Sequence, residues 1–142
     1  MAEKMIFDFK IETFPEQTSQ LNAVNGSARI IPFTGSVESE LFTGKILPGA
    51  ADVQITTADG VRHMHACYMF EGKDYTGENC RLFIDNNGYF MRGARPRPFE
   101  TVPSMMTDSK ALQEYLHAAR FRATGTREED GFLHIRVYDI LA

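Results

Sequence analysis

The sequence predicts a mainly β protein: an antiparallel β-barrel, calycin-like or similar, with one short covering α-helix near residues 108–119. Short runs that alternate apolar and polar residues recur along most of the chain, as in half-buried strands. Turn-forming glycine, asparagine and proline separate these runs, and only one segment has helical spacing. A sandwich fits the same pattern, but we favour a barrel because closure removes sheet edges.

The composition is typical of a single ordered domain spanning residues 1–142. Hydrophobic residues make up 43% and charged residues 24% of the chain. A chain of this length typically buries roughly two-thirds of its unfolded surface, so a real core is expected. The formal net charge of -4 argues against nucleic acid as the main partner.

The cysteine pattern and the lack of long apolar runs indicate the cellular compartment of the protein. Cys67 and Cys80 have no metal-ligand spacing, and a reduced protein is the simplest interpretation. Charged residues interrupt the first ten positions, where a secretory signal would need an apolar run. No run approaches the ~20 apolar residues of a membrane helix. We therefore expect a cytoplasmic protein with no membrane partner.

The first half of the chain predicts a strand followed by a meander. Residues 5–11 alternate strictly, and a polar connection follows at 16–27. The next run, 29–35, contains Pro32, which cannot donate to a ladder and predicts an edge or a bulge. Short runs at 37–41 and 45–47 complete the meander.

The second half predicts more strands and the helix. Runs 81–85 and 89–92 flank Asn87-Gly88, a pair typical of two-residue hairpin turns. Residues 93–103 hold several prolines and should form a loop or an extended connection. Thr107, Asp108 or Ser109 can cap the helix, and the runs 118–124 and 132–140 end the chain as strands.

The segment 51–70 is the most informative, because two strand-like runs meet at Asp59-Gly60. A two-residue turn there would set Gln54 opposite His65. One face would then be polar or thiol and the other apolar. A shift of one residue would place Ile55 beside His63 and mix the two sets, so we predict the unshifted register. The polar face carries Asp52, Gln54, His63, His65 and Cys67.

Asp52, His63 and His65 are the candidate catalytic residues, since a carboxylate and imidazoles suit acid–base chemistry near neutral pH. The alternative is that this face is simply the solvated outside of the sheet. It has no lysine, arginine or glutamate, which favours a lumen, a cleft or a subunit interface. The same three residues could ligate a metal, but paired histidines are common by chance and we predict no metal.

Other side chains are candidates for ligand binding: Arg29, Glu38, Gln54 and Tyr68. Arg29 could pair with Glu38 or hold an acid group of a ligand. The ring of Tyr68 is expected in the core, with its hydroxyl seeking a partner. Arg92, Arg95 and Arg97 form a basic group that suits an anion at a barrel mouth, although solvation alone also explains them.

Three segments in order carry a family resemblance: Arg29 to Gly35, Gly44 to Gln54, and Ile135 to Ile140. They resemble the domain-of-unknown-function family 3237, also called uncharacterised protein family 0311, over nearly the whole chain. The resemblance implies a small, self-associating β-barrel with no established activity. Arg29, Asp52 and Tyr68 match the family, whereas Val53, His65 and Cys67 depart from it.

These observations leave three classes of function. The first is binding of a small, partly apolar organic ligand in the barrel, with cofactor-free isomerase, lyase or hydratase chemistry if the protein is an enzyme. The second is a carrier or sensor without catalysis, and the third is a module of a homo-oligomer. No nucleotide-binding glycine loop is present, so we expect no cofactor.

Overall fold

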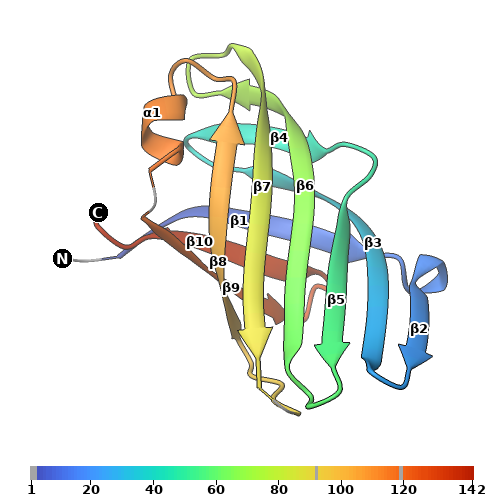
Figure 1. Ribbon diagram of the computed structural model, residues 1–142. Coiled ribbons are helices and arrows are strands. Elements are labelled where there is room, and N and C mark those ends of the chain that lie inside the picture. The colour runs from blue at the N-terminus through green and yellow to red at the C-terminus, as the bar shows by residue number, and fades with distance from the viewer. Residues whose placement is uncertain (1–2, 92, 119) are drawn as a thin grey trace.

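The computed structural model describes residues 3–91, 93–118 and 120–142. These residues form ten strands and two short helical segments, joined by turns and loops (Figure 1). The strands are β1 (Lys4–Thr13), β2 (Ser19–Ala23), β3 (Gly26–Glu38), β4 (Phe42–Ile46), β5 (Ala51–Thr57), β6 (Arg62–Asp74), β7 (Asn79–Phe90), β8 (Phe99–Thr107), β9 (Phe121–Arg127) and β10 (Leu133–Asp139). The helical segments are the 3₁₀ turn η1 (Pro15–Gln17) and α1 (Gln113–Leu116).

The strands form one closed antiparallel barrel, which confirms the predicted fold class. Neighbours run from β1 through β10, β9, β8, β7 and β6 to β4 and β3, and β1 then pairs with β3 to close the ring. The long strands β3 and β6 each pair with β5 near one end and with β4 near the other. β5 and β4 therefore share one place in the barrel wall.

The closing seam depends on two small features of β3. A Cβ atom on Gly35 would lie 2.2 Å from the carbonyl oxygen of Lys10, so only glycine permits this approach of β1. Pro32 lies between the stretch that pairs with β2 and the stretch that pairs with β1. The Pro32 carbonyl accepts a hydrogen bond from the Phe14 N–H on the side of β3 that faces β1 and β2. Proline has no N–H, but this position faces the gap between β2 and β1, so no hydrogen bond of the sheet is lost.

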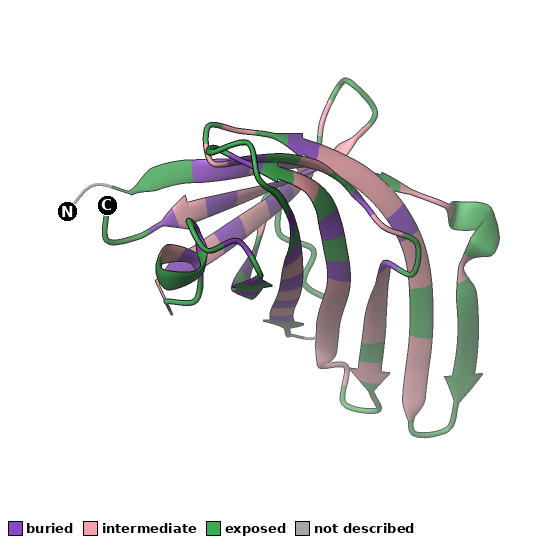
Figure 2. Ribbon diagram, turned by 90° about the horizontal axis from the view of Figure 1, so that it is seen from above, coloured by how far each residue is buried: buried purple, intermediate pink, exposed green. Residues whose placement is uncertain are grey.

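The core fills one end of the barrel with large side chains. Phe7, Phe9, Phe42 and Phe70 are almost fully buried there. Leu116 of α1 is 1% exposed and packs into the same cluster, so the helix covers this end, as predicted. Figure 2 shows buried and exposed positions alternating along the inner strands, whereas β2 at the edge is exposed throughout.

Some predicted boundaries were wrong. β7 runs without a break through Asn86, Asn87 and Gly88, where the sequence indicated a turn. Both inward positions are buried, and pairing with β6 and β8 holds the segment extended. The helix is also shorter than residues 108–119, because α1 covers only Gln113–Leu116.

The other corrections concern β2 and β8. β2 comes from the polar stretch predicted as a connection, since its residues are all exposed and give no apolar alternation. β8 begins at Phe99, inside the predicted proline-rich loop. Pro103 is tolerated there because β8 pairs with β9 only over residues 99–101, which leaves one side of Pro103 without a neighbouring strand. None of the helices in the described part of the chain has the length and apolarity to cross a bilayer.

Candidate functional site

The β5–β6 turn has three residues, not two, and this reverses the predicted register. Thr57 N–H donates to the Val61 carbonyl at 2.9 Å, and Gly60 N–H donates to the Thr57 carbonyl at 2.9 Å. Gly60 has a φ of 89°, while no non-glycine residue in the described segments has a positive φ. A two-residue turn would need a positive φ at Asp59 as well. The structure instead has a tight turn with a glycine bulge.

The observed register pairs Ile55 with His63, Val53 with His65 and Asp52 with Ala66. The prediction of one shared polar face was therefore wrong. Asp52 and Gln54 face the barrel interior, whereas His63, His65 and Cys67 lie on the outer surface of the sheet. The structure does not assemble the three candidate catalytic residues, and a catalytic role for any one of them stays a prediction.

The interior face of β5 and β6 borders a cavity of about 260 Å³. Its walls are mostly apolar and include Ile11, Ile31, Phe33, Met64 and Ile135. Its polar lining consists of Asp52, Gln54, Tyr68, Asn86, Thr101, Thr13 and Arg127. None of its described lining residues comes from α1.

Several polar atoms on this lining are buried without a hydrogen-bond partner among the described residues. They are Asp52 Oδ1, Tyr68 OH, Asn86 Oδ1 and Thr101 Oγ1. Tyr68, Asn86 and Thr101 are 4%, 6% and 7% exposed. Leaving a buried polar group unpaired costs about 1–3 kcal/mol. Four such atoms around one cavity are therefore a costly arrangement for a protein with no ligand to bind.

The cavity also changes the acid–base properties of its lining. Burial raises the pKa of Asp52, although Gln54 Nε2 donates to its Oδ2 at 2.8 Å and partly opposes the effect. Burial, together with the charge of Asp52, raises the pKa of Tyr68 far above the range of an exposed phenol. Tyr68 therefore stays a neutral hydroxyl, and Asp52 binds a proton more readily than a surface aspartate.

The ring of Tyr68 separates the cavity from the aromatic core. Its centroid lies 5.1 Å from that of Phe33, 6.0 Å from that of Phe9 and 5.7 Å from that of Phe70. These edge-on contacts hold the ring in one orientation. The predicted core position of Tyr68 is observed, and its hydroxyl is among the unpartnered atoms.

A second hollow adjoins the cavity and is lined by Arg62, Arg95, Arg97 and Arg127. It shares Gln54, Met64, Phe99, Arg127 and Leu133 with the first, so the two are continuous. We call this second hollow the arginine mouth. Sequence reasoning singled out Arg95 and Arg97, and Arg92 lies outside the described residues. Arg62 was missed, although its position two residues before Met64 places it on the same face.

Two predicted ligand-binding residues lie apart from the cavity lining. Arg29 pairs with Gln54 across β3 and β5 and so faces the barrel interior, but it is exposed. Glu38 is exposed at the opposite end of the same 13-residue strand. The structure therefore does not form the predicted Arg29–Glu38 pair.

The outer histidines belong to a separate polar network. His65 Nε2 lies 2.7 Å from Asp85 Oδ1 and 3.3 Å from Cys67 Sγ. His63 Nε2 lies 2.9 Å from Asn87 Oδ1, and its ring stacks on Tyr89 at 4.3 Å. Among the described residues, His65, Cys67 and Asp85 form the group whose ligand atoms lie within 4.8 Å of one another. These ligand types suit zinc, but all three side chains already satisfy one another.

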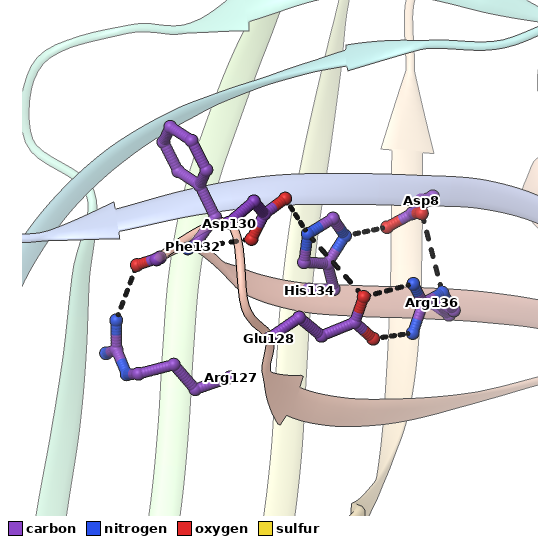
Figure 3. Close-up of polar contacts among 8 residues, drawn as sticks. Asp8, Arg127, Glu128, Asp130, Phe132, His134 and Arg136 are labelled. Carbon is purple, nitrogen blue, oxygen red and sulfur yellow. Dashed lines mark hydrogen bonds and ion pairs between the residues drawn. The ribbon is translucent and has the colours of Figure 1, made fainter.

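A cluster of charged side chains connects β1, near the start of the chain, with β10 and the β9–β10 turn near its end (Figure 3). His134 Nδ1 lies 2.8 Å from Asp8 Oδ1 of β1, and Nε2 lies 2.7 Å from Asp130 Oδ2 of the β9–β10 turn. Arg136 bonds both oxygens of Glu128, at 2.5 and 3.0 Å. Burial alone would lower the pKa of His134, but its two carboxylate partners raise it. These contacts join β10 to β1 and to the β9–β10 turn.

The comparisons with known proteins agree with this fold. The model of a family described as protein of unknown function, DUF3237, matches residues 2–140. The chain belongs to this family. A curated relative, a UPF0311 protein of Clostridium acetobutylicum, is 30% identical over 106 residues, which are 72% of this chain. The match spans 58% of that relative's own length. The family predicted from the sequence is thereby confirmed.

Solved structures resemble the whole barrel. A Clostridium acetobutylicum protein of unknown function has a TM-score of 0.75, with 22% identity and 97% of each chain covered. A conserved protein of unknown function from Rhodopseudomonas palustris has a TM-score of 0.70 and 23% identity over 96% of this chain and 95% of its own. A β-barrel-like protein of Acinetobacter baumannii has a TM-score of 0.70 and 17% identity, over 97% of this chain and 96% of its own. At these identities the likeness shows the fold alone.

Proposed function

We propose that this DUF3237 protein binds one small, partly apolar organic molecule in the barrel cavity. The observation that carries the proposal is the set of unpartnered polar atoms on Asp52, Tyr68, Asn86 and Thr101. An apolar cavity with a few convergent polar groups is typical of small-molecule sites. A ligand with an apolar body and an inner hydroxyl or carbonyl oxygen would bury the walls and pair these atoms.

A second candidate is acid–base catalysis in the same cavity. The raised pKa of Asp52 favours it, because a carboxyl group with a raised pKa is a stronger base than a surface aspartate. Tyr68 and Asn86 would then orient the reacting oxygen. If the protein is an enzyme, Asp52→Asn should abolish turnover and keep ligand affinity. In a carrier the same substitution should change affinity only.

The test uses two neighbouring asparagines on β7. Asn86 faces the cavity, and Asn87 lies on the outer surface, where it contacts His63. We expect 2-naphthol, a fluorescent probe with an apolar body and one hydroxyl, to bind the untagged protein. Asn86→Leu should weaken binding about tenfold, because it fills polar space and removes a hydrogen bond. Asn87→Leu is the matched control and should bind like the unmodified protein.

Native mass spectrometry of the protein purified without denaturants adds a second readout. The proposal expects one co-purified molecule per chain, lost in Asn86→Leu and kept in Asn87→Leu. Equal probe affinity in the two variants would place the binding outside the barrel. Absence of any bound molecule together with no 2-naphthol binding would overturn the proposal.

A further inference from the structure

Eight of the arginines that the structure describes fall into two groups by their partners, and Arg29 belongs to neither group. Arg81, Arg120, Arg122 and Arg136 each form an ion pair with a carboxylate at 2.5–2.8 Å. The arginines of the mouth, Arg62, Arg95, Arg97 and Arg127, have no ion pair with any described carboxylate. Four arginines without an ion pair in the described part of the chain therefore lie together at the opening of the cavity, although the formal net charge is -4.

This grouping is unfavourable without an anion. Arg62 Nε is buried with no hydrogen-bond partner, and the guanidinium lies over the Phe90 ring, 4.9 Å from its centroid. Burial and the charge of Arg95 lower the pKa of Arg62, and the carboxylate of Asp52 opposes them in part. Arginine nevertheless keeps its proton in proteins, and the single carboxyl group of Asp52 does not balance four guanidinium groups, so an anionic ligand would relieve the remaining repulsion.

One of these side chains is already held in place. Arg127 Nη1 donates to the Gly131 carbonyl at 3.1 Å, and the guanidinium also contacts Thr13 Oγ1 (Figure 3 shows the first contact). Arg127 lines both the cavity and the arginine mouth. A fixed guanidinium at the junction of an apolar cavity and a cationic opening offers its planar N–H groups to an oxyanion.

We propose that the ligand of the cavity is an organic acid, with its carboxylate at the arginine mouth and its apolar body between the cavity walls. A hydroxyl or carbonyl oxygen at its inner end meets Asp52, Tyr68 and Asn86. This inference rests on the proposed function and adds the charge and orientation of the ligand. The carboxylate binds the arginine N–H groups as paired, charge-assisted hydrogen bonds.

The test compares three probes that share one ring system. They are 2-naphthol, 6-hydroxy-2-naphthoate and its neutral isostere 6-hydroxy-2-naphthamide, followed by naphthalene fluorescence with the untagged, full-length protein. The naphthoate should bind at least about tenfold more tightly than the amide, the difference expected for one or two charge-assisted bonds. The 2-naphthol reports on the cavity alone.

Variants then locate the carboxylate. Arg127→Gln and Arg62→Gln should each remove most of the preference for the naphthoate over the amide. This ratio cancels any change in cavity affinity that the two probes share. Arg81→Gln is the control, because Arg81 is exposed and paired with Glu71 away from the cavity. If one of these two arginine variants fails to fold, the other still tests whether the carboxylate binds at the arginine mouth, since Arg62 and Arg127 lie on different strands.

The outcomes separate the two proposals. If all three probes bind equally and Asn86→Leu weakens each of them, the cavity binds ligands and the inference about the acid is wrong. A naphthoate preference that survives both arginine variants would also overturn the inference. If none of the probes binds, both the inference and the proposed function fail.

Discussion

The carboxyl group of Asp52 stands in a cavity where one oxygen bonds Gln54 and the other has no partner. Its pKa is higher in the folded protein than its ordinary value of 3.8. Between these two values the folded state binds more protons than the unfolded state, so stability falls as pH rises through that range. Above the folded pKa, the cost of the buried charge is complete.

Asp52→Asn should therefore stabilise the protein at pH 8 by about 1 kcal/mol, because the neutral amide avoids the cost of a buried charge. The gain should be smaller at pH 4, because the unmodified carboxyl group takes up a proton as the pH falls through its raised pKa. Urea unfolding of both proteins at the two pH values measures the difference. A variant that is less stable at pH 8 would contradict the burial argument, and exposed Glu40→Gln serves as the control.

His134 predicts a pH dependence of the same direction, but from a charge that stabilises the folded state instead of a charge that destabilises it. Its pKa is raised by Asp8 and Asp130, with Glu128 3.9 Å away, so its contribution to stability is complete below about 6.5 and is lost as pH rises through the folded value. His134→Gln should therefore destabilise the protein more at pH 6 than at pH 9, by about 1 kcal/mol. Urea unfolding at both pH values tests this. An equal loss in the free energy of unfolding at pH 6 and pH 9 would contradict a role for the His134 charge.

At the scale of elements, β8 and β9 show how a glycine shapes the cavity. Phe99 pairs with Gly125, and a Cβ atom on Gly125 would lie 2.1 Å from the Phe99 ring. The aromatic ring therefore covers the backbone of the neighbouring strand. The same ring lines both the cavity and the arginine mouth, so its position sets the width of the passage between them.

Gly125→Ala should push the Phe99 ring out of this position. We expect a loss of about 1–3 kcal/mol in the free energy of unfolding, the usual cost of overpacking, and weaker binding of 2-naphthol. Differential scanning calorimetry and fluorescence titration measure the two effects. Thr124→Ala, at the adjacent outward position, should change neither by a comparable amount. Unchanged binding in Gly125→Ala would show that Phe99 does not limit access.

The β5–β6 hairpin explains why the fold was easier to predict than the site. The alternation of residues 5–11 and 132–140 predicted strands correctly, because burial of one face fixes that pattern. Asp59-Gly60, however, fits both a two-residue and a three-residue loop, and the two differ by one residue in register. In the observed register, His63 and His65 lie on the outer face beside Ile55 and Val53. The prediction preferred the register that separates polar from apolar residues, and it therefore placed these histidines on the same face as Asp52.

Long-range pairing decided the other errors at this scale. Asn86-Asn87-Gly88 has the composition of a turn, yet neighbours on both sides extend it. No local signal distinguishes these outcomes. No local pattern indicated that Arg62 and Arg127 line the same hollow, because they come from strands that are brought near each other only when the barrel closes.

At the scale of the whole molecule, the basic opening contrasts with the formal net charge of -4. Charges at a concave opening attract counter-ions over about one Debye length, roughly 10 Å at 0.1 M salt. We therefore expect the association rate of 6-hydroxy-2-naphthoate to fall severalfold between 20 and 300 mM salt. Stopped-flow fluorescence measures this rate. The neutral amide is the control, and an equal salt dependence for both probes would rule out steering by the arginines.

The predicted homo-oligomer stays a prediction. The outer surface of β7 and β8 exposes Tyr89, Val102 and Met106, which are 65–70% exposed, and a contact between copies would cover them. If they lie in such a contact, Tyr89→Glu should shift the protein to the monomer in analytical ultracentrifugation. A protein that is monomeric at micromolar concentration before substitution would contradict this expectation.

The aromatic core beneath Tyr68 makes the cavity a dead end. A ligand of the proposed kind would leave by the route it took inward, past Arg95, Pro96 and Arg97. By microscopic reversibility, any change that only narrows or widens this passage slows or speeds capture and release by the same factor. Residence time and equilibrium affinity can therefore vary independently among relatives whose inner walls are alike.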